Sequence, residues 1–65
     1  MIRIGAQFQE ERKNQNLSIE EVSRATKIRT EFLNAIERGD YKKLPSPAYA
    51  HGFVRNYAKF LGLPV

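Results

Sequence analysis

The sequence predicts an all-α fold, a compact bundle of four to five short helices in a single domain of 65 residues. Apolar residues recur every three or four positions over most of the chain, which is the spacing of a helix with one buried side. The chain lacks the sustained alternation and the Asn-Gly or Asp-Gly turns that mark strands and hairpins. Helix-capping residues also flank the apolar stretches. The helices are expected at about 3–15, 18–26, 29–38, 47–52 and 53–61.

Apolar spacing defines the expected helices at 3–15 and 29–38. The first is apolar on one side, around Phe8, and charged elsewhere. The second has apolar residues at helical spacing up to Ile36. Gly39 follows it closely and can adopt the left-handed conformation that ends many helices.

A capping box marks the start of the expected helix at 18–26. Ser18 is a favourable N-cap, and Glu21 stands three residues later, where its side chain can bond back to the cap. Leu17 and Val22 are spaced to pack against each other across this cap. The sequence therefore predicts a well-defined start at Ser18.

The last helical segment also has recognisable ends. Ser46 can cap it, and Pro47 suits the first helical position, where no backbone N–H donor is needed. Gly62 is placed to end the helix. Gly52 costs about 1 kcal/mol relative to alanine inside a helix, so it is expected to divide the segment into a short fourth helix and a fifth.

Four of the seven aromatic residues fall in this last segment and follow one stripe of a helix, at Tyr49, Phe53, Tyr57 and Phe60. Small and apolar residues form the neighbouring stripe. Aromatic stripes usually belong to the core, yet both stripes together exceed what so thin a domain buries easily. Two interpretations follow, that all of them are core or that some form a docking surface.

Composition excludes several classes of function. The chain has no cysteine and a single histidine, His51, so it offers no metal site, and no cofactor is expected. No set of catalytic groups converges, so an enzyme is not expected. No apolar run approaches the ~20 residues that span a bilayer. The net charge of +4 is compatible with nucleic acid or an acidic protein surface, and also with simple solubility.

The stretch LSIEEVSRATKIRTEFLNAIERG, 17–39, resembles the Cro/repressor (XRE-like) helix-turn-helix family. That resemblance implies a sequence-specific DNA-binding regulator as one possible function. The residues available to read bases are Arg29, Thr30 and Asn34, with Lys27 and Arg38 available for phosphates. However, Ile19 and Lys27 stand where the family often has glutamine and glycine. The segment 29–38 has no net charge, which does not favour a phosphate-dominated interface.

A longer stretch, TKIRTEFLNAIERGDYKKLPSPAYAHGFVRNYAKFLGL, is similar to the cytoplasmic domain of the RodZ family of bacterial cell-shape proteins. The signature lies in the tail, at Tyr49, Gly52, Phe53, Arg55, Tyr57, Ala58, Lys59, Leu61 and Gly62. The resemblance implies the N-terminal domain of a longer, single-pass membrane protein on the cytoplasmic side of the bacterial inner membrane. It also implies an adaptor that binds the actin-like filament protein MreB and couples it to cell-wall synthesis.

The resemblance further implies a contact surface. The family's two contact aromatics fall at Tyr49 and Phe53, whereas Tyr57 and Phe60 are expected to close the core. Basic residues around the contact aromatics would face an acidic partner surface, and the candidates are Arg55, Lys59, Lys42 and Lys43. The sequence thus leaves two functions open, a filament-binding adaptor and a DNA-binding regulator.

Overall fold

The computed structural model describes residues 4–64. In this part of the chain the regular structure is entirely helical, which confirms the predicted all-α class. The elements are α1 (Ile4–Asn14), α2 (Ile19–Thr26), α3 (Thr30–Arg38), a short 3₁₀ helix η1 (Tyr41–Lys43) and α4 (Pro47–Leu61).

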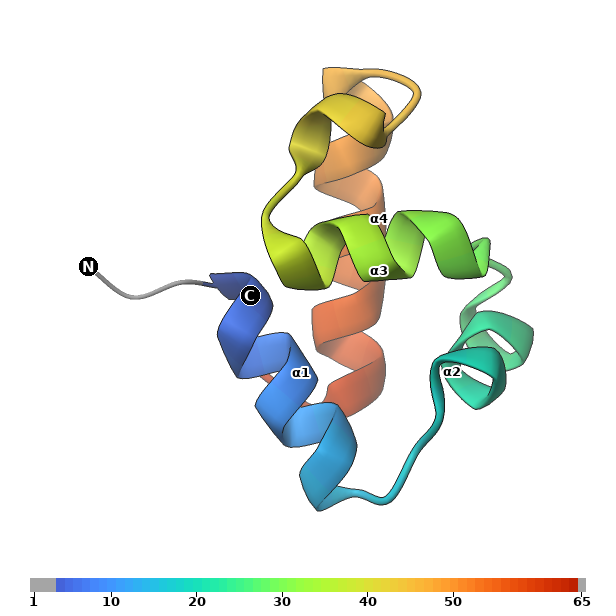
Figure 1. The fold of residues 1–65 in the computed structure, drawn as a ribbon, viewed down its shortest axis with the longest axis vertical. Coiled ribbons are helices and arrows are strands. Elements are labelled where there is room, and N and C mark those ends of the chain that lie inside the picture. Colours follow the sequence, from blue (N-terminus) through green and yellow to red (C-terminus); the bar gives the residue numbers. More distant parts are fainter. Residues whose placement is uncertain (1–3, 65) are drawn as a thin grey trace.

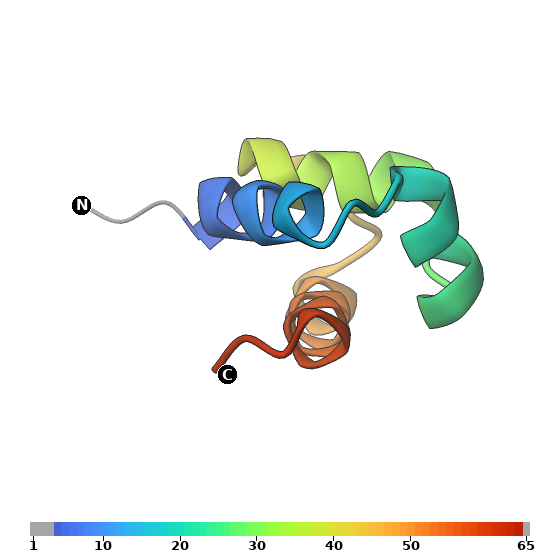
Figure 2. The ribbon, with the colours of Figure 1, turned by 90° about the horizontal axis from the view of Figure 1, so that it is seen from below.

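The helices form two layers. Figures 1 and 2 show α1 and α3 in one layer, α4 crossing behind them, and α2 at the side of the molecule. Helices α2 and α3 pack together as the two helices of a helix-turn-helix, and α1 packs against both α3 and α4. Because α4 is covered on one side only, its opposite side faces solvent.

The helix ends follow the sequence signals. The Glu21 backbone N–H donates to Ser18 Oγ at 3.0 Å, and the Ser18 N–H donates to the Glu21 carboxylate at 2.8 Å, which confirms the capping box. Gly39 and Gly62 adopt φ values of 73° and 81° and end α3 and α4 as predicted. Lys27 ends α2 at φ 65°, in the left-handed region that non-glycine residues rarely enter.

The predicted division of the last helix is wrong. Helix α4 runs without interruption from Pro47 to Leu61. Gly52 is exposed, with open space where a Cβ atom would lie. Residues on both sides of it pack onto the core, and this burial outweighs the cost of about 1 kcal/mol for one glycine in a helix.

The core lies between the two layers and draws on every helix. Its largest fully buried side chains are Val22, Leu33, Ile36 and Tyr57. The edge of the Phe8 ring packs against Tyr57, with 4.9 Å between the ring centroids. Leu44, which follows η1, is also buried.

A hydrogen-bonded group of charged and polar side chains joins α1, α3 and α4. Arg12 of α1 donates from Nε to Glu37 of α3 at 2.8 Å and from a second nitrogen at 3.1 Å. The Tyr57 hydroxyl of α4 donates to the same carboxylate. Arg12 also donates to the Leu17 carbonyl at 2.9 Å, at the entry to α2. The hydrogen bond to Glu37 is the main reason that the pKa of Arg12 is raised. This group holds α4 in a fixed position against α1 and α3.

This environment predicts alkaline destabilisation that depends on Tyr57. Burial, and then the hydrogen bond to Glu37, raise the pKa of Tyr57 above its ordinary value. Above about pH 10 the unfolded chain therefore releases this proton while the folded chain retains it, so the free energy of unfolding falls as pH rises. Denaturant titrations between pH 8 and 11.5 should show this slope. It should be shallower in Tyr57→Phe, and Tyr41→Phe, which changes an exposed phenol, should keep the wild-type slope. Equal slopes in all three proteins would contradict the assignment.

Candidate functional site

The exposed side of α4 carries stacked aromatic side chains. Tyr49 is 59% exposed and lies on Phe53, with 5.7 Å between the ring centroids. Phe53 in turn stacks on Phe32 of α3, with centroids 5.6 Å apart and planes 18° apart. Such pairs contribute about 0.5–1.5 kcal/mol beyond their buried area. Phe53 therefore contacts two aromatic rings, one stacked on it and one tilted by 34°.

The start of α4 fixes where Tyr49 lies. Ser46 is the N-cap and accepts a hydrogen bond from the Tyr49 backbone N–H at 3.3 Å, and Pro47 occupies the first helical position. Proline has a fixed φ value and needs no N–H partner there. Tyr49 therefore projects from a rigid first turn.

The prediction that Phe60 closes the core is wrong. The residue is 40% exposed, whereas Tyr57 is fully buried as predicted. Phe60 follows Phe53 by seven residues, or about two turns, so the two side chains leave α4 within about 20° of each other. Phe60 thus extends the exposed aromatic surface towards the C-terminal end of α4. We refer to Phe32, Tyr49, Phe53 and Phe60 as the aromatic face.

The basic residues that the sequence grouped with the aromatics lie elsewhere on α4. Arg55 follows Phe53 by two residues, so the two side chains leave the helix about 160° apart. Lys59 follows Phe53 by six residues and is about 120° away. Both are exposed. Arg55 therefore lies on another side of α4 than Phe53, whereas Lys59 borders the aromatic face, about 80° from Tyr49 and 100° from Phe60.

Lys42 and Lys43 belong to η1, which precedes α4 in the chain and lies near its first turn in Figure 1. Both side chains are exposed. Lys43 Nζ lies 3.9 Å from an Asp40 carboxylate oxygen, in an ion pair open to solvent. These two lysines remain candidates for the rim of a partner interface near Tyr49.

The candidate DNA-reading residues lie on the other side of α3. Thr30 and Asn34 are one turn apart and half-buried. Each is two residues from Phe32, so they point about 160° away from the aromatic face. Arg29 caps α3 without a side-chain hydrogen bond, and its guanidinium lies 3.7 Å from the Glu31 carboxylate.

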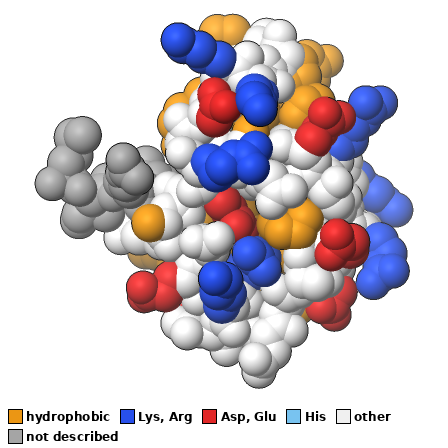
Figure 3. All heavy atoms as spheres, in the orientation of Figure 1, with side chains coloured by type: hydrophobic (Ala, Val, Ile, Leu, Met, Phe, Trp, Pro, Cys, Tyr) orange, Lys and Arg blue, Asp and Glu red, His pale blue; other side chains and the backbone are white. Residues whose placement is uncertain are grey.

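Lys27 and Arg38, the candidate phosphate ligands, are both exposed. Figure 3 views the molecule from the side on which α3 lies in front of α4, and it shows acidic side chains interspersed among the basic ones. A phosphate backbone is bound through a surplus of positive charge. The charges on this side are too balanced to favour that interaction.

Phe32 is the site residue that sequence reasoning missed. In the sequence it stands at an apolar position of the helix expected at 29–38, where helical spacing favours the core, and it is bulky and apolar for a base-reading helix. The spacing of Phe32 and its apolar character both describe α3 alone. Its role as a support for Phe53 depends on how α3 and α4 cross, which no local pattern reveals.

Comparison with known proteins gives the family. Residues 7–65 match a family model described as a helix-turn-helix domain. The chain belongs to this helix-turn-helix family. The match includes α4, so the aromatic helix lies within the family's domain.

Two curated relatives of this helix-turn-helix domain are informative. The cytoskeleton protein RodZ of Streptococcus pneumoniae is 40% identical over 55 residues, which cover 85% of this chain and 20% of that protein. The uncharacterized membrane protein YmfM of Bacillus subtilis is 36% identical over 47 residues, which cover 72% of this chain and 16% of that protein. The expected resemblance to RodZ is confirmed. No solved structure matches the chain.

The chain spans about a fifth or less of the length of these relatives. Within residues 4–64, none of the helices has the length and apolar character needed to cross a membrane.

Proposed function

We propose that this helix-turn-helix domain is a non-enzymatic cytoskeletal adaptor that binds the actin-like filament protein MreB. In the full-length protein it would link the filament to the membrane and to cell-wall synthesis from the cytoplasmic side of the bacterial inner membrane. The observation that carries the proposal is the aromatic face. Tyr49 and Phe60 are exposed on it, Phe53 is half-buried and stacked on Phe32, and it includes Tyr49 and Phe53, to which the RodZ resemblance assigns the contact.

The physical case rests on preorganisation. Interfaces take most of their binding energy from a few aromatic or arginine side chains, and truncating one typically costs about 2 kcal/mol or more. Ordering a side chain on binding costs about 0.5–1.5 kcal/mol. Because Phe53 is already stacked on Phe32 and lies close to the tilted ring of Tyr49, that cost is reduced here.

DNA binding through α3 is the second function that the fold permits. The positions of Thr30 and Asn34 on the outer side of α3 would suit it. The ion pair of Arg29 with Glu31 and the balanced charge around them favour the adaptor instead.

We expect Tyr49→Ala to weaken co-sedimentation of the domain with MreB filaments by at least about tenfold, since a truncated anchor costs about 2 kcal/mol. Tyr49 is mostly exposed, so the variant should lose no more than the contribution of its contact with Phe53, about 0.5–1.5 kcal/mol, and should remain folded under the conditions of the assay. Tyr41→Ala is the matched control, because Tyr41 is an exposed tyrosine outside the stacked cluster. Co-sedimentation at several protein concentrations gives the affinities.

Unchanged affinity in Tyr49→Ala would contradict the proposal, and so would an equal loss in Tyr41→Ala. A gel shift of duplex DNA at sub-micromolar protein, abolished by Arg29→Ala and by added salt, would favour the regulator.

A further inference from the structure

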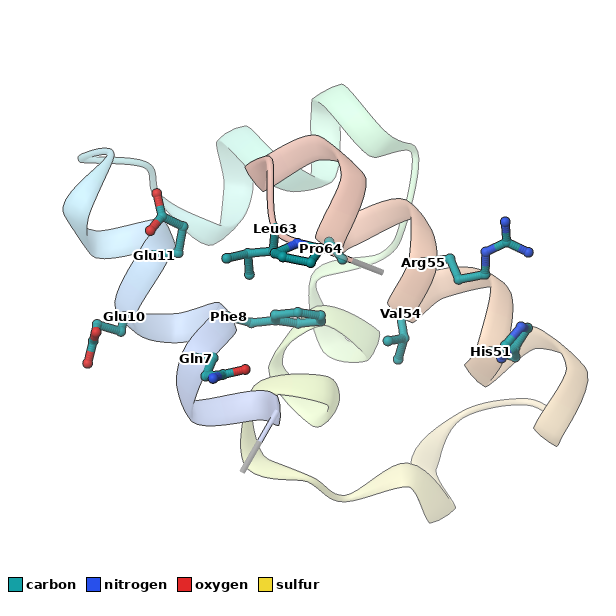
Figure 4. A pocket seen from close by; sticks show the side chains of 10 residues that line it. Gln7, Phe8, Glu10, Glu11, His51, Val54, Arg55, Leu63 and Pro64 are labelled. Carbon is teal, nitrogen blue, oxygen red and sulfur yellow. The ribbon is translucent and has the colours of Figure 1, made fainter. Parts of the chain in front are cut away.

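Gly52 lies on the solvent-facing side of α4, beside the aromatic face. It is exposed, and a Cβ atom added there would meet no atom within 4 Å. It follows Tyr49 by three residues, so the two positions leave the helix about 60° apart. His51, Val54 and Arg55 instead line a pocket between α4 and α1 (Figure 4). Gly52 therefore belongs to the open side of α4 that borders the aromatic face.

Within residues 4–64, the fold gives no reason for a glycine at position 52. Glycine destabilises the interior of a helix relative to alanine. At Gly5 the missing side chain lets α1 approach α3, since a Cβ atom would lie 2.5 Å from the Glu37 carbonyl oxygen. Gly39 and Gly62 have the left-handed backbone that favours glycine. Gly52 has neither feature, because it lies inside α4 with open space around it.

The surroundings of Gly52 suit close approach by another protein. A glycine lets a second backbone come nearer to the helix than any side chain would allow. Tyr49, which is 59% exposed, lies to one side of it. Lys59 follows it by seven residues and leaves α4 about 20° further from Tyr49, and its side chain is exposed. A partner seated over Gly52 would therefore touch the aromatic face and Lys59 together.

The charge of α4 selects the chemistry of that partner. Its 15 residues include no acidic side chain, and the basic ones are His51, Arg55 and Lys59. A second copy of the domain packed through the same helix would bring like charges together, which is unfavourable. An acidic surface would be attracted. The occupant that fits is therefore an acidic segment of a different protein.

We propose that Gly52 is the point at which α4 comes closest to the backbone of its filament partner, with an acidic segment of that partner lying between the aromatic face and Lys59. This inference rests on the proposed function, which supplies the partner. The missing side chain sets how closely the partner docks. The glycine thus lowers the stability of the isolated domain and permits the contact, a compromise known from other functional sites.

A series of substitutions at Gly52 tests this contact. Gly52→Ala should weaken co-sedimentation with MreB filaments at least about fivefold and Gly52→Gln at least about thirtyfold, since overpacking of a close contact costs about five- to 150-fold. Neither variant should unfold at a lower midpoint than the wild type, because both residues favour a helix more than glycine does. Ala25→Gln enlarges an exposed residue of α2 and, as the matched control, should bind like the wild type.

A charge reversal tests the chemistry of the partner. Lys59→Glu should weaken co-sedimentation at least about fivefold at low salt, and the loss should shrink as salt screens the charges. Wild-type affinity in Lys59→Glu would overturn the assignment of an acidic segment.

The remaining outcomes separate this inference from the proposed function. Wild-type affinity in both Gly52 variants, together with a loss in Tyr49→Ala, would overturn the inference and leave the proposed function standing. Wild-type affinity in Tyr49→Ala as well would overturn both. The inference is also overturned if Ala25→Gln loses as much affinity as Gly52→Gln. The same holds if the domain alone sediments as a dimer that Gly52→Gln dissociates, because a second copy would then cover this side of α4.

Discussion

Replacing Glu37 by glutamine is expected to destabilise the domain by about 3 kcal/mol. The side chains of Glu37 and Arg12 are only 4% and 12% exposed. Removing one charge of a fully buried pair typically costs about 3–5 kcal/mol, and because this pair is partly buried its loss is expected at the lower end of that range. A domain of this size has a total stability of only about 3–10 kcal/mol at ~0.05–0.15 kcal/mol per residue. Urea denaturation should therefore show a large fall in the unfolding midpoint of Glu37→Gln.

Two further variants separate charge from packing. Glu31→Gln removes a carboxylate from an ion pair whose side chains are 77% and 67% exposed, and it should change stability by less than about 1 kcal/mol. The triple variant Arg12→Met/Glu37→Leu/Tyr57→Phe removes the whole polar group and should recover at least half of the loss. Equal losses of stability in Glu37→Gln and Glu31→Gln would contradict the stabilising role of the group formed by Arg12, Glu37 and Tyr57.

Replacing Gly5 by alanine is expected to destabilise the domain by about 1–3 kcal/mol through overpacking. A Cβ atom at this position would lie 2.5 Å from the Glu37 carbonyl oxygen and closer still to that of Ile36. These carbonyls belong to the last turn of α3, where the Gly39 N–H donates back to Ile36 at 3.1 Å. Because that turn is fixed, α1 would have to move away and would draw Arg12 from Glu37.

Gly52→Ala is the matched control for this prediction. A Cβ atom there would meet no atom within 4 Å, and the position lies inside α4. Alanine should therefore raise stability by about 1 kcal/mol, the difference in helix propensity. Thermal or urea unfolding should move the two midpoints in opposite directions. Destabilisation by both substitutions, or by neither, would contradict the close approach of α1 to α3.

Features that depend on neighbours in the chain could be predicted from the sequence. The capping box at Ser18, the glycine ends of α3 and α4, and the start of α4 after Ser46 are set by hydrogen bonds within a few residues. Apolar spacing is equally local, and it predicted the helical class and the burial of Tyr57. The candidate site was partly predictable for the same reason, since Tyr49 and Phe53 lie one turn apart on one helix.

Features that depend on how the helices cross could not be predicted in this way. The sequence by itself determined where helices form and which residues could serve as anchors. Only the tertiary structure placed Phe32 beneath Phe53 and left Phe60 exposed. It also brought Arg12, Glu37 and Tyr57 together from three helices. The physical reason is that burial and side-chain pairing between helices depend on crossing geometry, whereas periodicity reports only the side of a helix on which a residue lies.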